Sequence, residues 1–172
     1  MEYVLKRIHP DGIDAALAKA DKYRALNQPA EAESICRDVL ALDAEHALAL
    51  RILGLALTDQ FEPASGGRFT AAQQVFARLR DPYERAFYTG LAYERQAKAQ
   101  LAAALPPRAV RPLFERALGF YAEAERLAPT GNDDAILRWN SCVRALPAAG
   151  APDAPEAESS LHWEADSAPR HR

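Results

Sequence analysis

Reactive and metal-binding side chains are scarce in this chain. Its 172 residues include only two cysteines, four histidines and one methionine. They contain no Cys-x-x-Cys pair, His-Glu-x-x-His helix, glycine-rich phosphate loop or nucleophile elbow. Cys36 and Cys142 each lie within an apolar helical pattern, which favours buried structural thiols over a disulfide. The sequence therefore predicts a protein that is not an enzyme and uses no cofactor or metal.

An excess of basic charge is also missing. Lys and Arg together number 21 and Asp and Glu 24, giving a formal net charge of -3. Such a chain is poorly suited to a phosphate backbone, to an anionic membrane or to helical-repeat RNA binding. Glu2, Lys6 and Arg7 interrupt any secretory signal, and no later apolar run is long enough to span a membrane. We expect a cytoplasmic protein with neither nucleic acid nor membrane as partner.

The apolar residues favour helices. They make up 49% of the chain while aromatics make up 8%, and alanine dominates, which is typical of closely packed helices. Proline and glycine breakers divide the sequence into amphipathic segments. Asp11, Asp81 and either Asn132 or Asp133 are expected N-caps. The pattern predicts an all-α fold of about seven helices, over residues 12–27, 29–43, 45–59, 69–80, 82–105, 112–127 and 132–146.

These helices predict one domain with two flanking segments. Residues 1–10 form an N-terminal extension, residues 11–146 the helical domain and residues 147–172 a tail. The tail is rich in Pro, Ala, Ser and acidic residues, so we expect it to be disordered. Leu161 and Trp163 are its apolar island and a candidate docking motif, although random composition also accounts for them.

A weak repeat relates the helix pairs at a period of about 34 residues. Its clearest elements are Leu53-Gly54, Gly90-Leu91-Ala92-Tyr93 and the later residues Ala117, Tyr121 and Pro129. At these positions the chain resembles the tetratricopeptide repeat (TPR) family. Residues 131–140 are similar to a segment of uncharacterised bacterial TPR proteins. Two of the three units carry longer connections than the family pattern.

The resemblance implies a short right-handed superhelical array of antiparallel helix pairs, a TPR-like α-solenoid. Small residues such as Gly54 and Gly90 would let helices approach, while Phe76 and Tyr121 fill the space beside them. Trp139 stands where a small residue is expected. The last helix is therefore predicted to be a C-terminal cap.

The resemblance also implies a concave groove lined by the first helix of each pair. Free arginines there would favour an acidic-hydrophobic peptide; alternatively, each arginine pairs with an acid such as Asp21, Asp59 or Glu94. The Lys and Asn residues of the chaperone-binding TPR clamp are absent from the matching positions. The groove candidates are Leu17, Arg24, Arg51, Leu55, Phe87, Leu91, Arg95, Ile136, Asn140 and Arg144.

The function predicted from these features is protein binding without catalysis. The chain would act as an adaptor, scaffold or assembly factor that holds a partner segment in the groove. One alternative is a structural subunit that self-associates through its repeats. Another is a regulatory subunit of an enzyme encoded nearby.

Overall fold

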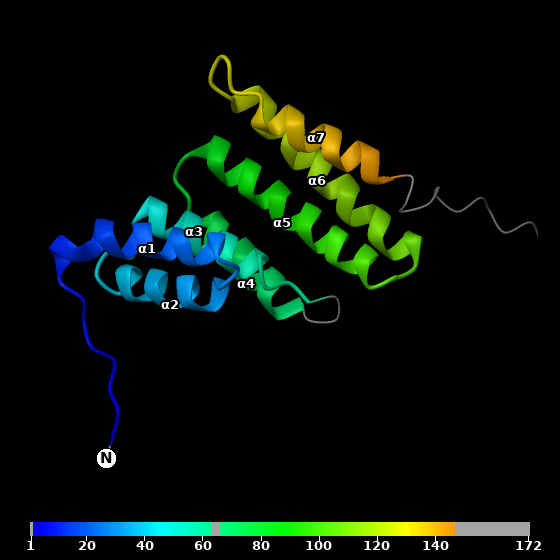
Figure 1. Cartoon of the computed structure of the whole chain (residues 1–172). Coiled ribbons are helices and arrows are strands. Elements are labelled where there is room, and N and C mark those ends of the chain that lie inside the picture. Colours follow the sequence, from blue (N-terminus) through cyan, green and yellow to red (C-terminus); the bar gives the residue numbers. More distant parts are fainter. Residues whose placement is uncertain (1, 63–65, 147–172) are drawn as a thin grey trace, which may run out of the picture.

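The computed structural model describes residues 2–62 and 66–146, which form seven α-helices and no β-strand (Figure 1). The predicted all-α class is confirmed for this part of the chain. The tail at 147–172, with Leu161 and Trp163, lies outside the described residues. The helices are α1 Ile13–Ala25, α2 Pro29–Leu40, α3 Ala47–Thr58, α4 Gly66–Ala77, α5 Pro82–Ala102, α6 Pro107–Leu127 and α7 Asp134–Ala145.

Asp81 caps α5 through its side chain as the sequence predicts, while the N-cap of α7 is Asp133, whose side chain makes no capping hydrogen bond. Asp81 accepts the N–H of Tyr83 at 2.9 Å, and Pro82 opens α5. Asn132 accepts the N–H of Asp134 at 3.0 Å at the start of α7. The predicted cap at Asp11 is wrong, because Asp11 lies inside a 3-10 turn, Pro10–Gly12, that precedes α1.

The start of α6 differs from the prediction by more than one turn. The helix was expected at Pro112 but begins at Pro107, so Pro112 lies inside it. Proline there removes one backbone hydrogen bond and crowds the preceding turn. Val110 and Phe114, which flank Pro112, are fully buried. Their burial offsets the local cost, so tertiary packing overrides the local signal.

Consecutive helices pack against one another along the whole chain, and α1 also contacts α3, α3 contacts α5, and α5 contacts α7. The odd-numbered helices therefore share one side of the molecule, which we call the odd-helix face. In Figure 1, α5 lies between the group α1–α4 and the pair α6–α7. None of the described helices combines the length and apolarity that a membrane crossing requires.

Two glycines allow close contacts between helices in the core. A Cβ added at Gly54 would lie 2.1 Å from Cε1 of Phe76, and one added at Gly90 would lie 3.0 Å from Cε1 of Tyr121. Both rings are fully buried. The predicted alternation of small and aromatic residues is thus present at these two contacts.

Aromatic rings connect the core between α1 and α4 with the core between α5 and α7. Phe76 of α4 stacks on Tyr88 of α5 with ring centroids 5.4 Å apart, and Tyr88 contacts Phe87 at 5.2 Å. Phe87 in turn meets Tyr121 of α6 at 5.9 Å. Such pairs add specific geometry to the hydrophobic burial. They hold the two groups of helices in one relative orientation.

Candidate functional site

An apolar hollow of about 390 Å³ lies on the odd-helix face between α1, α3 and α5. Leu48 on its rim is 38% exposed, although α3 is otherwise largely buried. Leu55 and Tyr88 are half-buried in its wall. The side chains that line the hollow are Asp14, Leu17, Ala18, Asp21, Leu48, Arg51, Ile52, Leu55 and Tyr88.

Asp59 pairs with two of the predicted groove arginines. Arg24 Nε of α1 donates to Asp59 Oδ2 at 2.8 Å. Arg95 of α5 pairs with Oδ1 of the same carboxylate and donates to Thr58 Oγ1 at 2.7 Å. Asp59 follows α3 directly, so this cluster joins α1, α3 and α5 at one point. Both guanidiniums are therefore engaged, and Asp21 is the further acid near this cluster, 3.6 Å from Arg24.

Arg51 is occupied in the same way. Its Nη1 lies 2.8 Å from Oε1 of Glu84, and this pair connects α3 with α5 beside the hollow. Asp14 and Asp21 on the rim are exposed, and Asp21 contacts Arg24 only at 3.6 Å. The sequence allowed either free or paired arginines in the groove. In the structure Arg24, Arg51 and Arg95 are each paired with an acid. The rim presents more acidic than basic charge.

Glu94 forms a buried polar centre under the other half of the odd-helix face. Its side chain is 1% exposed and accepts the hydroxyl of Tyr121 in α6 at 2.6 Å. Lys98 lies 2.5 Å from Glu94, and Arg138 of α7 lies 3.6 Å away. Burial and the neighbouring carboxylate raise the pKa of Tyr121, so the phenol stays protonated and donates. One carboxylate thus ties α5, α6 and α7 together.

Sequence reasoning placed Glu94 at the groove, as a possible arginine partner, and not as a buried polar centre. The spacing of Glu94 could have indicated its burial. Leu91 lies three residues before it and Ala97 three residues after it, and both are buried, so Glu94 lies on the inward side of the helix. A charged residue on the inward stripe of a helix needs partners. The identity of those partners in α6 and α7 was not readable from local patterns.

Four more predicted groove residues occupy three different environments. Leu17 is 1% exposed and lines the first hollow, whereas Leu91 is buried and supports the helices from beneath. Leu55 borders the first hollow. Phe87 borders a second hollow of about 460 Å³, whose other lining residues are Asp134, Leu137, Arg138 and Ser141.

The predicted groove residues Ile136, Asn140 and Arg144 do not line the hollow beside Phe87. All three are exposed. The reason is the rotation of α7, which buries Ala135 and Cys142 and turns Leu137, Arg138 and Ser141 towards Phe87. Periodicity alone did not indicate this rotation, because the larger apolar residues Ile136, Trp139 and Val143 lie on a side of α7 that stays exposed.

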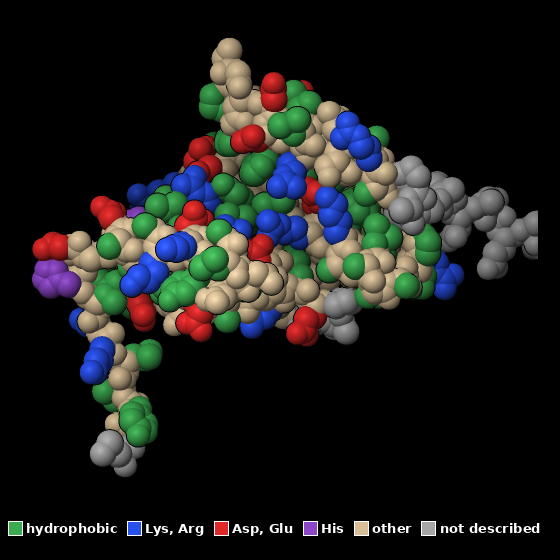
Figure 2. Space-filling view, viewed as in Figure 1, with side chains coloured by type: hydrophobic (Ala, Val, Ile, Leu, Met, Phe, Trp, Pro, Cys, Tyr) green, Lys and Arg blue, Asp and Glu red, His purple; other side chains and the backbone are tan. Residues whose placement is uncertain are grey.

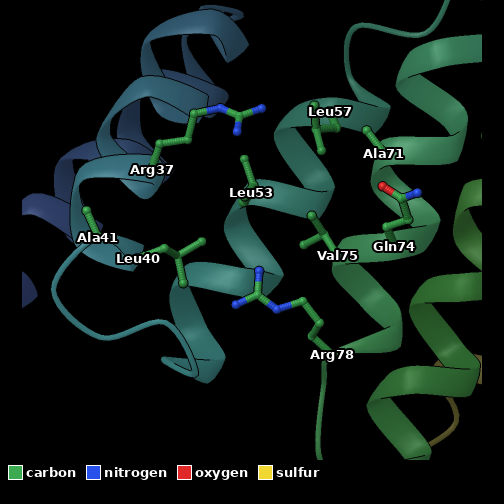
Figure 3. A pocket seen from close by; sticks show the side chains of 9 residues that line it. All are labelled: Arg37, Leu40, Ala41, Leu53, Leu57, Ala71, Gln74, Val75 and Arg78. Atoms are coloured by element: carbon green, nitrogen blue, oxygen red, sulfur yellow. The ribbon is translucent and has the colours of Figure 1, made fainter.

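A third hollow, of about 610 Å³, lies between α2, α3 and α4 (Figure 3). Leu40, Leu53 and Val75 form its apolar part, and Arg37 and Arg78 flank it. Both arginines are engaged: Arg37 pairs with Glu33 at 2.7 Å, and Arg78 donates to the carbonyl of Ala44. This hollow is a second place where an apolar side chain can dock.

The cysteines offer no reactive group. Both are free and buried, and burial raises the pKa of each thiol to about 12. At about pH 8 only about one thiol in ten thousand would be ionised. In the native chain we expect Cys36 and Cys142 to resist iodoacetamide, and after unfolding in urea both should be alkylated, as measured by intact mass. Rapid alkylation of the native chain would contradict their burial.

The described part of the chain is an all-helical protein with an apolar hollow framed by paired charges. Figure 2 shows acidic and basic side chains mixed on its surface. No group of three His, Cys, Asp or Glu residues in the described ranges is placed to hold a metal. No family model matches the chain, and no curated protein matches it either.

Proposed function

We propose that this chain is a non-catalytic TPR-like interaction module, which holds a segment of a partner protein along the odd-helix face. Two observations support a solenoid of helix pairs. The odd-numbered helices contact one another in order, from α1 to α7. Gly54 and Gly90 lie against Phe76 and Tyr121, as small and aromatic positions do in the repeat pattern. The buried, free thiols agree with a cytoplasmic location.

The apolar hollow beside Leu48 is the observation that carries the proposal. Apolar hollows with few polar groups are typical docking sites for a side chain of a partner. Arg51 and Glu84 fix one wall, and Asp59 ties the three helices together at one end. Because these contacts exist before any partner arrives, binding costs little additional ordering of the protein.

The charges around this hollow favour an apolar segment flanked by Lys or Arg. Asp14 and Asp21 are exposed on the rim, and the nearby Arg51 is already paired with Glu84. An acidic-hydrophobic segment would meet these two carboxylates without a free guanidinium to compensate. We therefore propose a basic-apolar segment in place of the acidic one that the arginine positions suggested.

The test compares two exposed leucines. Leu48 lies on the hollow and is 38% exposed, while Leu127 at the end of α6 is 43% exposed and lines none of the three hollows. Leu48→Gln and Leu127→Gln make the same chemical change at similar exposure, so differences in binding report the location. Proteins captured by the intact chain from a lysate of the source cell would be identified by mass spectrometry. Their segments would then be titrated as synthetic peptides.

We expect Leu48→Gln to weaken binding of the captured segment at least tenfold, whereas Leu127→Gln leaves it unchanged. A loss of tenfold corresponds to about 1.4 kcal/mol, which is reasonable for one apolar anchor. Equal binding by both variants would reject the odd-helix face and direct attention to the hollow between α2 and α4. A segment without basic residues would reject the proposed ligand chemistry.

A further inference from the structure

The outer side of α7 carries an apolar stripe that no described helix covers. Ile136 is 37% exposed, Trp139 36% and Val143 44%. Their spacing of three and four residues places them along one side of the helix. Ala135 and Cys142, which are buried, lie roughly a quarter turn away around the helix. Three large apolar side chains in a row on a terminal helix indicate an interaction surface.

We propose that this stripe binds the same stripe of a second copy, with the two α7 helices antiparallel around a two-fold axis. The charges of the helix support this arrangement. Asp133 stands at the N-terminal end and Arg144 in the last turn, and both are exposed. In an antiparallel pair, each Asp133 faces Arg144 of the second copy. A parallel pair would instead bring like charges together at both ends.

The register of the stripe is also self-complementary. Ile136 and Val143 are about two helical turns apart and equally distant from the middle of the stripe. An antiparallel partner therefore sets Ile136 against Val143 in both directions. Asn140 lies near the middle, where its amide can donate to and accept from the amide of the second copy. The helix dipoles of an antiparallel pair also attract each other.

This surface is separate from the proposed peptide site. Leu137, Arg138 and Ser141 lie on another side of α7, towards Phe87, and the hollow at Leu48 is formed by α1, α3 and α5. Pairing through the stripe leaves both accessible. The dimer would present two binding faces at once and raise avidity for a partner with two segments.

The contact is small, because α7 has only 12 residues. A single helix pair lies below the area of standard stable interfaces. We therefore expect a dimer that dissociates with a Kd of roughly 10–100 µM. The test is sedimentation equilibrium of the full chain, loaded between about 1 and 300 µM.

Charge reversal gives the sharpest experiment. Asp133→Arg and Arg144→Asp each place like charges at both ends of an antiparallel dimer, so each variant alone should associate at least tenfold more weakly. An equimolar mixture of the two variants restores opposite charges at both ends. We expect the mixture to regain the affinity of the original chain within about threefold. Asp133 makes no capping hydrogen bond through its side chain, so its replacement removes no cap.

Two further variants test the apolar part. Val143→Gln should weaken association at least tenfold, whereas Leu137→Gln, at the more exposed position on another side of α7, should leave it unchanged. Far-UV circular dichroism would verify that all variants are folded. Three results would overturn the proposal: a monomer at every concentration, no recovery in the mixture, or equal effects of Val143→Gln and Leu137→Gln. A monomer would also be the outcome if residues 147–172 covered the stripe within one chain.

Discussion

Replacing Gly54 by alanine is expected to lower the free energy of unfolding by about 3 kcal/mol. The added Cβ would lie 2.1, 2.5 and 2.6 Å from three ring carbons of Phe76. Real Cβ atoms do not approach other atoms so closely, and Phe76 is fully buried, so its ring has no free space to enter. Overpacking of this kind typically costs 1 to 3 kcal/mol, more than the helix propensity that alanine gains.

Gly119 provides the matched control. It also lies inside a helix, α6, but an added Cβ there would meet nothing within 4 Å. Gly119→Ala should therefore raise the free energy of unfolding by about 1 kcal/mol through helix propensity alone. Urea unfolding followed by far-UV circular dichroism measures both variants. Stabilisation by both would mean that α3 and Phe76 do not pack as closely as described.

The contact of Gly54 with Phe76 could be predicted because the repeat pattern assigns both residues to facing positions. Helix boundaries were predictable where a proline and a cap coincide, as at Asp81 and Pro82. These signals are local, since backbone sterics and capping act within a few residues. Pro112 shows the limit of such rules. Its helix continues because Val110 and Phe114 are buried against other helices.

The pairing of the arginines required the three-dimensional structure. Arg24 and Asp59 are 35 residues apart in sequence, and Arg51 and Glu84 are 33 apart. No local pattern selects one acid among several at such separations. The sequence left free and paired arginines as equal alternatives, and the structure contains the pairs. This changes the ligand that we propose from acidic to basic.

The rotation of α7 was not predictable for another reason. The large apolar residues Ile136, Trp139 and Val143 lie along one side of α7 and stay exposed, so hydrophobic periodicity alone would turn that side inward. The small residues Ala135 and Cys142 allow α7 to pack closely, and they determine which side faces inward. The hollow beside Phe87 is consequently lined by Leu137, Arg138 and Ser141 and not by the candidates Ile136, Asn140 and Arg144.

Replacing Glu94 by alanine is expected to lower the free energy of unfolding by about 4 kcal/mol. The carboxylate is the acceptor for the buried hydroxyl of Tyr121, and it lies close to Lys98 and Arg138. Removal leaves that hydroxyl without its partner and opens a cavity between α5, α6 and α7. An unsatisfied buried group costs about 1 to 3 kcal/mol, and the cavity adds to it.

Glu115→Ala is the control for losing a carboxylate from a helix. Glu115 is exposed and pairs with Arg111 at 2.9 Å, four residues earlier on the same helix. Exposed pairs of this kind contribute about 0.5 kcal/mol or less. Thermal and urea unfolding should therefore separate Glu115→Ala clearly from Glu94→Ala. Similar losses in the two variants would contradict the burial of Glu94.

A double-mutant cycle with Tyr121→Phe separates the hydrogen bond from the cavity. In the original chain, Tyr121→Phe removes the donor and should cost about 1 to 2 kcal/mol, because hydrogen bonds to charged groups are stronger than neutral ones. In the Glu94→Ala background the hydroxyl has already lost its acceptor, so the same change should cost nothing or stabilise the protein. The expected coupling is thus about 1 to 2 kcal/mol. Additive effects would mean that Glu94 stabilises the three helices by filling space and by its contacts with Lys98 and Arg138, and not through Tyr121.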